Sequence, residues 1–188
     1  MVKGISIALF FSLAFLSAYA QTNTINKRSA FKQQYTIENG LPTNEVYGAV
    51  QDNFGLIYLF SDRGITKCDG STFNTLNKAN GLPENVVTKG KKDAKGRLWF
   101  STLNNKLFYL QDSIVEIKLR KIIKENGVSS KGFRINDFYV DGQDVIHILS
   151  SKAWGESLYY RYSLSGKLVI DTIVNTRCSF IYKHFKDG

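Results

Sequence analysis

A repeated sequence unit is the feature that most restricts how this chain can fold. Residues 38–42 read ENGLP, and residues 79–83 read ANGLP, 41 positions later. The match then continues in register at the same offset, pairing Asn44 with Asn85, Val46 with Val87, Asp52 with Asp93, Gly55 with Gly96, Ile57-Tyr58-Leu59 with Leu98-Trp99-Phe100, and Ser61 with Thr102. One fixed period with so many matches predicts an architecture in which each unit packs against the next.

The pattern within one unit predicts four short antiparallel strands joined by tight turns. Three motifs of the unit favour turns: the Gly and Pro of the NGLP segment, Asp-x-x-Gly, and Asp-Gly. The residues between these motifs either alternate between apolar and polar or are mostly apolar and aromatic. In the first unit the expected strands are residues 44–51, 56–60, 65–68 and 72–76. Four strands in about 40 residues are typical of a propeller blade, which cannot bury its apolar faces alone.

A third, weaker unit follows after an insertion. Residues 125–128 read ENGV and resemble the opening motif without its proline. Asn136 precedes Asp144 by eight residues, as Asn44 precedes Asp52, so Asp144 is interpreted as the turn aspartate of a shortened turn. Residues 145–151 then correspond to the strands of Tyr58 and Trp99. About ten inserted residues, 120–131, are expected to form either a short amphipathic helix or a long loop.

These patterns predict an all-β fold made of about three to four propeller blades, which is an incomplete propeller. The expected units are residues 35–76, 77–118 and 125–165, followed by a strand-like remainder to Gly188. Residues 1–20 read as a secretory signal peptide, with a charge at Lys3, an apolar core and a cleavage site after Ala20. An uncleaved anchor is the alternative, although the apolar run is short for a membrane span. The mature domain, 21–188, is predicted to be periplasmic or secreted, with no membrane span after cleavage.

Composition supports a folded domain and limits its partners. Hydrophobic residues make up 43% and aromatic residues 13% of the chain, which is enough for a core. The formal net charge of +9 falls to +8 when Lys3 is removed with the leader, and basic residues cluster at 89–97 and 118–124. Either this is a solvated basic face, or it favours an acidic polysaccharide or a membrane surface. Nucleic acid is a poor partner for an exported protein.

Neither a cofactor nor a catalytic site is predicted. Cys68 and Cys178 show no metal-ligand spacing, although a disulfide is allowed outside the cytoplasm. Tyr58 and Trp99 are expected to pack between blades, and Asp52 and Asp93 to form turns. His147 is expected to be a packed core residue. The remaining candidates for acid–base chemistry have no supporting pattern; they are Glu38, Glu84, Glu156 and His184.

The repeat resembles the two-component regulator propeller repeat. The resemblance rests on residues 38–42, Gln51-Asp52-x-x-Gly55, Asp69-Gly70 and Gly96 to Thr102, and it is strong over 35–112 and weak over 136–161. It implies a seven-bladed propeller, often one of two in tandem, in the periplasmic part of a sensor histidine kinase or hybrid two-component regulator, many of which sense glycans or related cues. The family carries no catalytic signature and fixes no ligand contact.

Two departures from the family pattern stand out. Residues 58–61 read YLFS where WFGT is usual, and residues 104–106 read NNK where a Gly-Leu turn is expected. Because 168 residues hold at most four such units, the chain is expected to be a truncated or partial propeller, with a free-standing four-bladed protein as the alternative. The predicted function is an extracytoplasmic sensing or ligand-binding module of a two-component signalling protein, and not an enzyme. The alternatives are an envelope protein-interaction scaffold and, further behind, a propeller glycoside hydrolase or lyase. Expected partners are a glycan or other small extracellular ligand, and remaining blades or a homo-oligomer.

Overall fold

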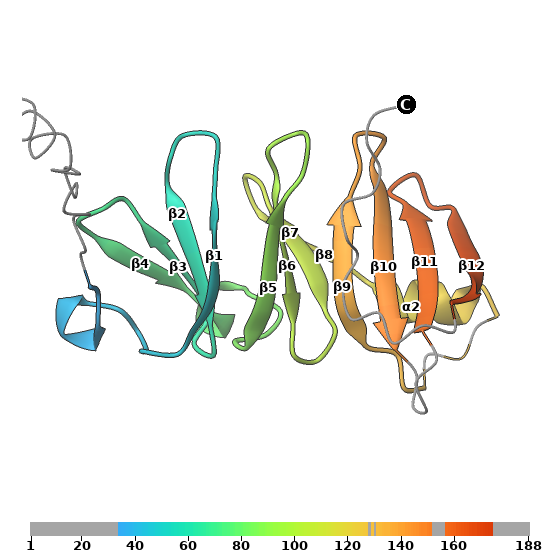
Figure 1. Cartoon of the computed structure of the whole chain (residues 1–188), viewed down its shortest axis with the longest axis horizontal. Helices are drawn as coiled ribbons and strands as arrows, with labels where there is room; N and C mark the ends of the chain where they lie inside the picture. Colours follow the sequence, from blue (N-terminus) through green and yellow to red (C-terminus); the bar gives the residue numbers. More distant parts are fainter. Residues whose placement is uncertain (1–33, 128, 130, 152–156, 175–188) are drawn as a thin grey trace, which may run out of the picture. The chain divides into compact units, whose positions relative to one another are not determined.

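The computed structural model of the chain describes residues 34–127, 129, 131–151 and 157–174 (Figure 1). The contacts along the chain divide it into two units, residues 1–34 and 35–188, and every described strand belongs to the second. The predicted signal peptide lies outside the described residues. So do Glu156, Cys178, His184 and the rest of the C-terminal stretch from residue 175 onward, so the structure does not test the predictions made for them.

Three four-stranded antiparallel sheets make up the described part of the fold, as the repeat predicted (Figure 1). In each sheet every strand pairs with the strand that follows it in sequence. The first sheet comprises β1 (Val46–Gln51), β2 (Ile57–Ser61), β3 (Ile65–Cys68) and β4 (Phe73–Leu76). The second comprises β5 (Val87–Lys92), β6 (Leu98–Thr102), β7 (Leu107–Leu110) and β8 (Ile114–Ile117). The third comprises β9 (Ile135–Val140), β10 (Val145–Ser151), β11 (Ser157–Ser163) and β12 (Leu168–Val174).

Tyr58 and Trp99 occupy equivalent places in their sheets, which the repeat required. Tyr58 pairs with Val50 of β1, and Trp99 pairs with Lys91 of β5, in each case the residue eight positions earlier. The third sheet extends the series, because His147 pairs with Tyr139 of β9 at the same separation. His147 is therefore the third member of this set of positions.

The turn aspartate of the third unit is Asp141, so the prediction that Asp144 holds this place is wrong. Asp52 Oδ1 accepts hydrogen bonds from the backbone N–H groups two and four residues later, and Asp93 Oδ1 does the same. Asp141 Oδ1 repeats this pattern with Gln143 and Val145, both at 2.9 Å. Asp144 instead stands where the other units have a glycine, and its φ of 61° is accordingly positive.

Correct placement of Asp141 also corrects the length of the insertion. The first two turn aspartates are 41 residues apart and the next two are 48 apart, so seven residues are inserted, not about ten. The turn itself has its full length of four residues, and it was missed because Gly142 and Asp144 replace the expected spacing of Asp and Gly.

The inserted residues form a short amphipathic helix, which was one of the two alternatives. In the first two units a 3-10 turn stands at this place: η1 (Ile37–Asn39) and η2 (Lys78–Asn80). The side chain of Asn44 or Asn85 accepts the first N–H of the turn, which explains why this asparagine repeats. In the third unit α2 (Leu119–Glu125) replaces the turn. Leu119 and Ile123 are buried on one side of the helix.

Two seams join the sheets, and both have apolar interiors. The first seam lies between the first and second sheets and is formed by a cluster around Phe60, Ile65, Phe100 and Phe108. The second seam lies between the second and third sheets, and α2 contributes to it; its buried residues include Trp99, Leu107, Leu119, Ile123, Phe133, Phe138, Ile146 and Ile148. Trp99 is fully buried, so its predicted role in packing between blades is confirmed. No helix within the described ranges is long and apolar enough to cross a bilayer.

Candidate ligand-binding site

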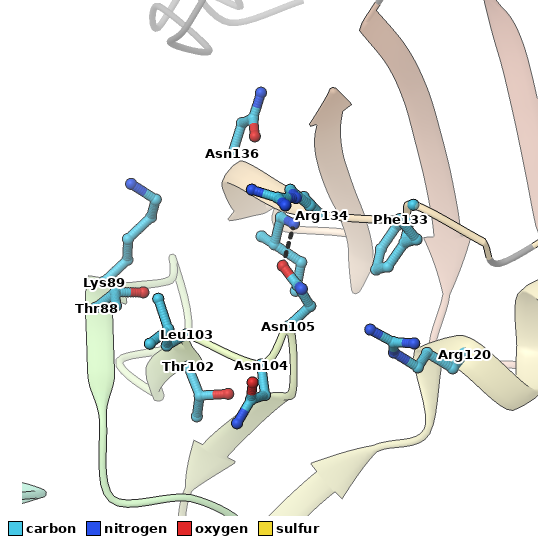
Figure 2. A pocket seen from close by; sticks show the side chains of 12 residues that line it. Thr88, Lys89, Thr102, Leu103, Asn104, Asn105, Arg120, Phe133, Arg134 and Asn136 are labelled. Carbon is cyan, nitrogen blue, oxygen red and sulfur yellow. Dashed lines mark hydrogen bonds between the residues drawn. The ribbon is translucent and has the colours of Figure 1, made fainter. Parts of the chain in front are cut away.

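A hollow of about 820 Å³ opens at one end of the second seam (Figure 2). Its walls come from the start of β5, the β6–β7 turn, the first turn of α2 and the segment that enters β9. Most lining residues are polar or basic, and they are Thr88, Lys89, Thr102, Leu103, Asn104, Asn105, Arg120, Gly132, Phe133, Arg134, Ile135 and Asn136. A volume in this range is typical of sites for small molecules.

The β6–β7 turn forms one wall, and Asn105 fixes it to the third sheet. Asn105 has a φ of 62°, a left-handed conformation that asparagine tolerates better than most residues. Its side-chain oxygen accepts a hydrogen bond of 2.7 Å from the backbone N–H of Ile135, drawn as the dashed line in Figure 2. In the first sheet the equivalent residue is Gly64, which has no side chain to reach across a seam. Asn104 and Asn105, which stand where a Gly-Leu turn was expected, therefore form one wall of this site.

The opposite wall is held by buried contacts. Phe133 is 4% exposed, and its ring lies edge-on to Tyr160 with 5.6 Å between ring centres. The backbone N–H of Arg134 donates to Ser150 Oγ at 3.3 Å. These contacts fix the backbone while the Arg134 side chain remains exposed. Figure 2 shows the Arg120 guanidinium reaching from the helix side toward the hollow.

Three cationic side chains line the site, and no lining residue is acidic. The three are Lys89, Arg120 and Arg134, and none of them forms an ion pair with another residue in the described part of the chain. One carboxylate stands behind the wall: Glu84 accepts a hydrogen bond of 2.7 Å from Asn104. This bond lowers the pKa of the Glu84 carboxyl group. The local balance is still positive.

At the other end of the second seam, the charges are paired instead. Arg97 Nε donates to Asp93 Oδ2 at 2.6 Å, and Trp99 Nε1 donates to the same oxygen at 2.8 Å. Arg97 and Lys95 also bind Asp144, which joins the β5–β6 turn to the β9–β10 turn. Hydrogen bonds from Lys95 and Arg97 lower the pKa of Asp144. This network uses its charges internally, so it acts as a clamp between sheets.

His147 lies in a separate polar cluster and is 7% exposed, in agreement with a packed residue. Its Nε2 lies 2.9 Å from Asp141 Oδ2, its Nδ1 bonds the Tyr159 hydroxyl, and its ring stacks on Tyr139. Burial alone would raise the pKa of Asp141, but hydrogen bonds from His147 and two backbone N–H groups lower it overall. Thus His147 repeats the role of Trp99, whose side chain also bonds its turn aspartate.

Of the acids considered in the sequence, the two that the structure describes do not line the site. Glu38 lies in η1, and Glu84 lies in the connection before β5, outside the lining set. The described residues contain no group of three or more His, Cys, Asp or Glu side chains placed to hold a metal ion. Reasoning from the sequence missed Arg134, and it noticed Lys89 and Arg120 only as members of two basic clusters. The available signal was the position of Arg120 and Arg134 within or just after the insertion, since a repeat that is interrupted once often carries function there.

Comparison with known proteins supports the fold and little more. No family model matches the chain, and no curated protein matches it in sequence. Among solved structures, it resembles the extracellular domain of the proposed hybrid two-component system BT4673 from B. thetaiotaomicron, with a TM-score of 0.59 and 14% identity. That match covers 79% of this chain and 19% of the other.

A second structure of the BT4673 extracellular domain, described as that of a one-component system, matches with a TM-score of 0.57 and 15% identity. It covers 75% of this chain and 18% of the other. The chain thus spans about a fifth of the length of the structures it resembles. At these identities the likeness shows a shared blade fold.

Proposed function

We propose that this chain is an extracytoplasmic sensing module that belongs to a two-component signalling protein and binds a small ligand at the second seam. The observation that carries the proposal is the hollow beside the β6–β7 turn, built from the residues at which the second and third units differ from the first. The signal-peptide pattern and the repeat resemblance support the location and the signalling role. So does the likeness to the extracellular domain of BT4673, a proposed two-component system.

The arrangement suits binding better than catalysis. Lining groups are amides, hydroxyls and cations that can orient a ligand through hydrogen bonds. Glycoside hydrolysis needs two carboxyl groups facing one bond, and the lining set supplies none. We therefore assign no chemical step to the site and propose a role in recognition.

Thermal unfolding of the purified chain against a panel of soluble sugars, sugar acids and small metabolites tests this proposal. A ligand that binds only the folded state raises the melting temperature, by an amount that grows with its concentration relative to Kd. We expect at least one panel member to do so in the wild-type chain and to lose most of its effect in Asn105→Gly. A flat panel, or a shift that survives this substitution unchanged, would contradict binding at the second seam.

A further inference from the structure

The geometry points to a ligand class: we propose that the second-seam hollow takes the carboxylate, sulfate or phosphate group of a small hydroxylated molecule. This inference rests on the proposed function and deepens it, because it states what chemistry the same site recognises. Three observations support it: the charge of the lining, its hydrogen-bonding groups and the contrast with the closed first seam.

The charge of the lining favours an anion. Lys89, Arg120 and Arg134 come from three separate segments, namely β5, α2 and the entry to β9, yet they line one hollow. Elsewhere in this seam, cations are paired: Lys91 binds Asp137 at 2.6 Å, and Arg97 binds Asp93 and Asp144. Three cations gathered without an acidic partner among the described residues repel one another, and an anion placed between them removes that cost. Arginine also offers a planar fork of donors that fits the oxygens of such anions.

The hydrogen-bonding groups of the lining favour a hydroxylated ligand. Beside the cations the walls carry two threonines and three asparagines, whose hydroxyl and amide groups both donate and accept. These groups match the hydroxyls of a polyol or sugar. The apolar lining comes from three residues: Phe133 and Ile135 are almost buried, whereas Leu103 is 63% exposed. A purely apolar ligand would therefore leave most of the lining unsatisfied.

The first seam shows that the blade fold does not by itself create this hollow. At the place of Lys89 the first sheet has Gly48, whose missing Cβ would lie 2.5 Å from the Phe60 ring. That ring fills the space, whereas the second sheet has the small Ser101 at the place of Phe60. At equivalent positions of the repeat, the first sheet pairs Gly48 with Phe60, and the second sheet pairs Lys89 with Ser101. The same pair of changes therefore provides both the empty space and one of the positive charges of the hollow.

Matched sugars separate the charge from the rest of the ligand. D-glucuronate and D-glucose differ only in the group at C6, and D-glucose 6-sulfate and D-glucose 6-phosphate carry the other two anions on the same ring. NMR titration of the full chain reads binding at the backbone amide of Ile135, whose N–H is held by Asn105 inside the site. We expect the three anionic sugars to shift this amide and glucose to bind at least about tenfold more weakly, as the loss of a charged hydrogen bond implies. The strongest of the three identifies the anion.

Two variants test whether the site cations are responsible. Arg134→Gln should weaken the anionic sugars by about tenfold and leave the already weak glucose signal unchanged. Arg63→Gln is the matched control, because Arg63 lies in the β2–β3 turn of the first sheet with its side chain 68% exposed, and it removes the same charge. It should change affinity by less than about twofold, since exposed charges away from the site are screened.

The outcomes separate this inference from the proposed function. Equal binding of glucose and glucuronate at Ile135 would overturn the anionic class while leaving a sensing site in place. Equal loss in Arg63→Gln and Arg134→Gln would also overturn it, because the effect would then come from net charge alone. If no charged sugar shifts Ile135 but a neutral panel compound does, the class is wrong. If nothing in either experiment binds, the proposed function fails with it.

Discussion

The two seams use equivalent positions of the same repeat and reach different results. In the first seam Phe60 lies over Gly90, where an added Cβ would come within 2.7 Å of its ring, and packs edge-on to Phe100. In the second seam Ser101 occupies the position equivalent to Phe60. Ion pairs link the two sheets there, and a hollow remains at one end. The backbone of a blade thus tolerates both a closed and a hollow seam. A few side-chain sizes decide which one forms.

The sharpest test of the closed seam is to remove its central ring. Phe60→Ala should lower the free energy of unfolding by about 3–5 kcal/mol, because it removes a buried aromatic ring and leaves a cavity between two glycines. Urea denaturation monitored by circular dichroism measures the change. Phe54→Ala is the control, since Phe54 is 91% exposed at the β1–β2 turn and should cost well under 1 kcal/mol. Similar losses in the two variants would mean that the first seam is not closed by Phe60.

A reciprocal exchange compares the β2–β3 and β6–β7 turns directly. A Cβ at Gly64 would lie 2.0 Å from the backbone oxygen of Leu76, and its φ is 128°, so Gly64→Asn should cost more than about 1 kcal/mol. Asn105→Gly keeps an allowed backbone and loses only the bond to Ile135, which is worth about 0.5–1.5 kcal/mol.

Urea midpoints of both variants, measured at equal protein concentration, give the comparison. The two turns differ in what they require: the first needs glycine for space, whereas the second uses asparagine for a contact. If Gly64→Asn proved no worse than Asn105→Gly, the two turns would not differ in the way the structure indicates.

The same contrast explains what the sequence could predict. The fold followed from positions that repeat, because each has a local physical reason: Asp52 and Asp93 hold their turns, Asn44 and Asn85 cap a 3-10 turn, and Trp99 fills a seam. These reasons act within one unit or between neighbours at a fixed spacing. They could therefore be read from the period alone.

The site could not be read in this way, because its residues do not repeat. Arg120 lies within an insertion whose path no period fixes, and Arg134 lies just after it. Lys89 and Arg120 appeared only as members of two basic clusters. Misplacing the third turn at Asp144 had a similar cause: Asp took the place of Gly, and the spacing from Asn136 happened to match. What did mark the site was the pair Asn104-Asn105, a visible departure from the expected turn, although its contact with Ile135 needed three-dimensional coordinates.

The paired end of the second seam should respond to acid, and this is the smallest effect expected. Lys95 and Arg97 lower the pKa of Asp144 through their hydrogen bonds. A carboxylate whose folded pKa is lowered stabilises the fold fully above its unfolded pKa, and this contribution is lost as the pH falls through the folded value. Asp144→Asn keeps a residue that tolerates the positive φ and removes the charge. The variant should therefore melt at a lower temperature than the wild type at neutral pH. This difference in melting temperature should narrow as the pH falls below about 3.9, the ordinary pKa of an aspartate.

Thermal unfolding from neutral to acidic pH, at low and high salt, measures the difference in melting temperature between the wild type and Asp144→Asn. Asp112→Asn is the control, since Asp112 is exposed in the β7–β8 turn and should show no such narrowing. Salt should also narrow the difference for Asp144→Asn, because exposed ion pairs are screened. If this difference in melting temperature stayed constant with pH, the network of Lys95, Arg97 and Asp144 would stabilise the fold through packing and not through charge. The two ends of the second seam would then not differ in how charge stabilises them, and the contrast between the ion pairs at one end and the three cations without an ion-pair partner among the described residues at the other would lose its meaning.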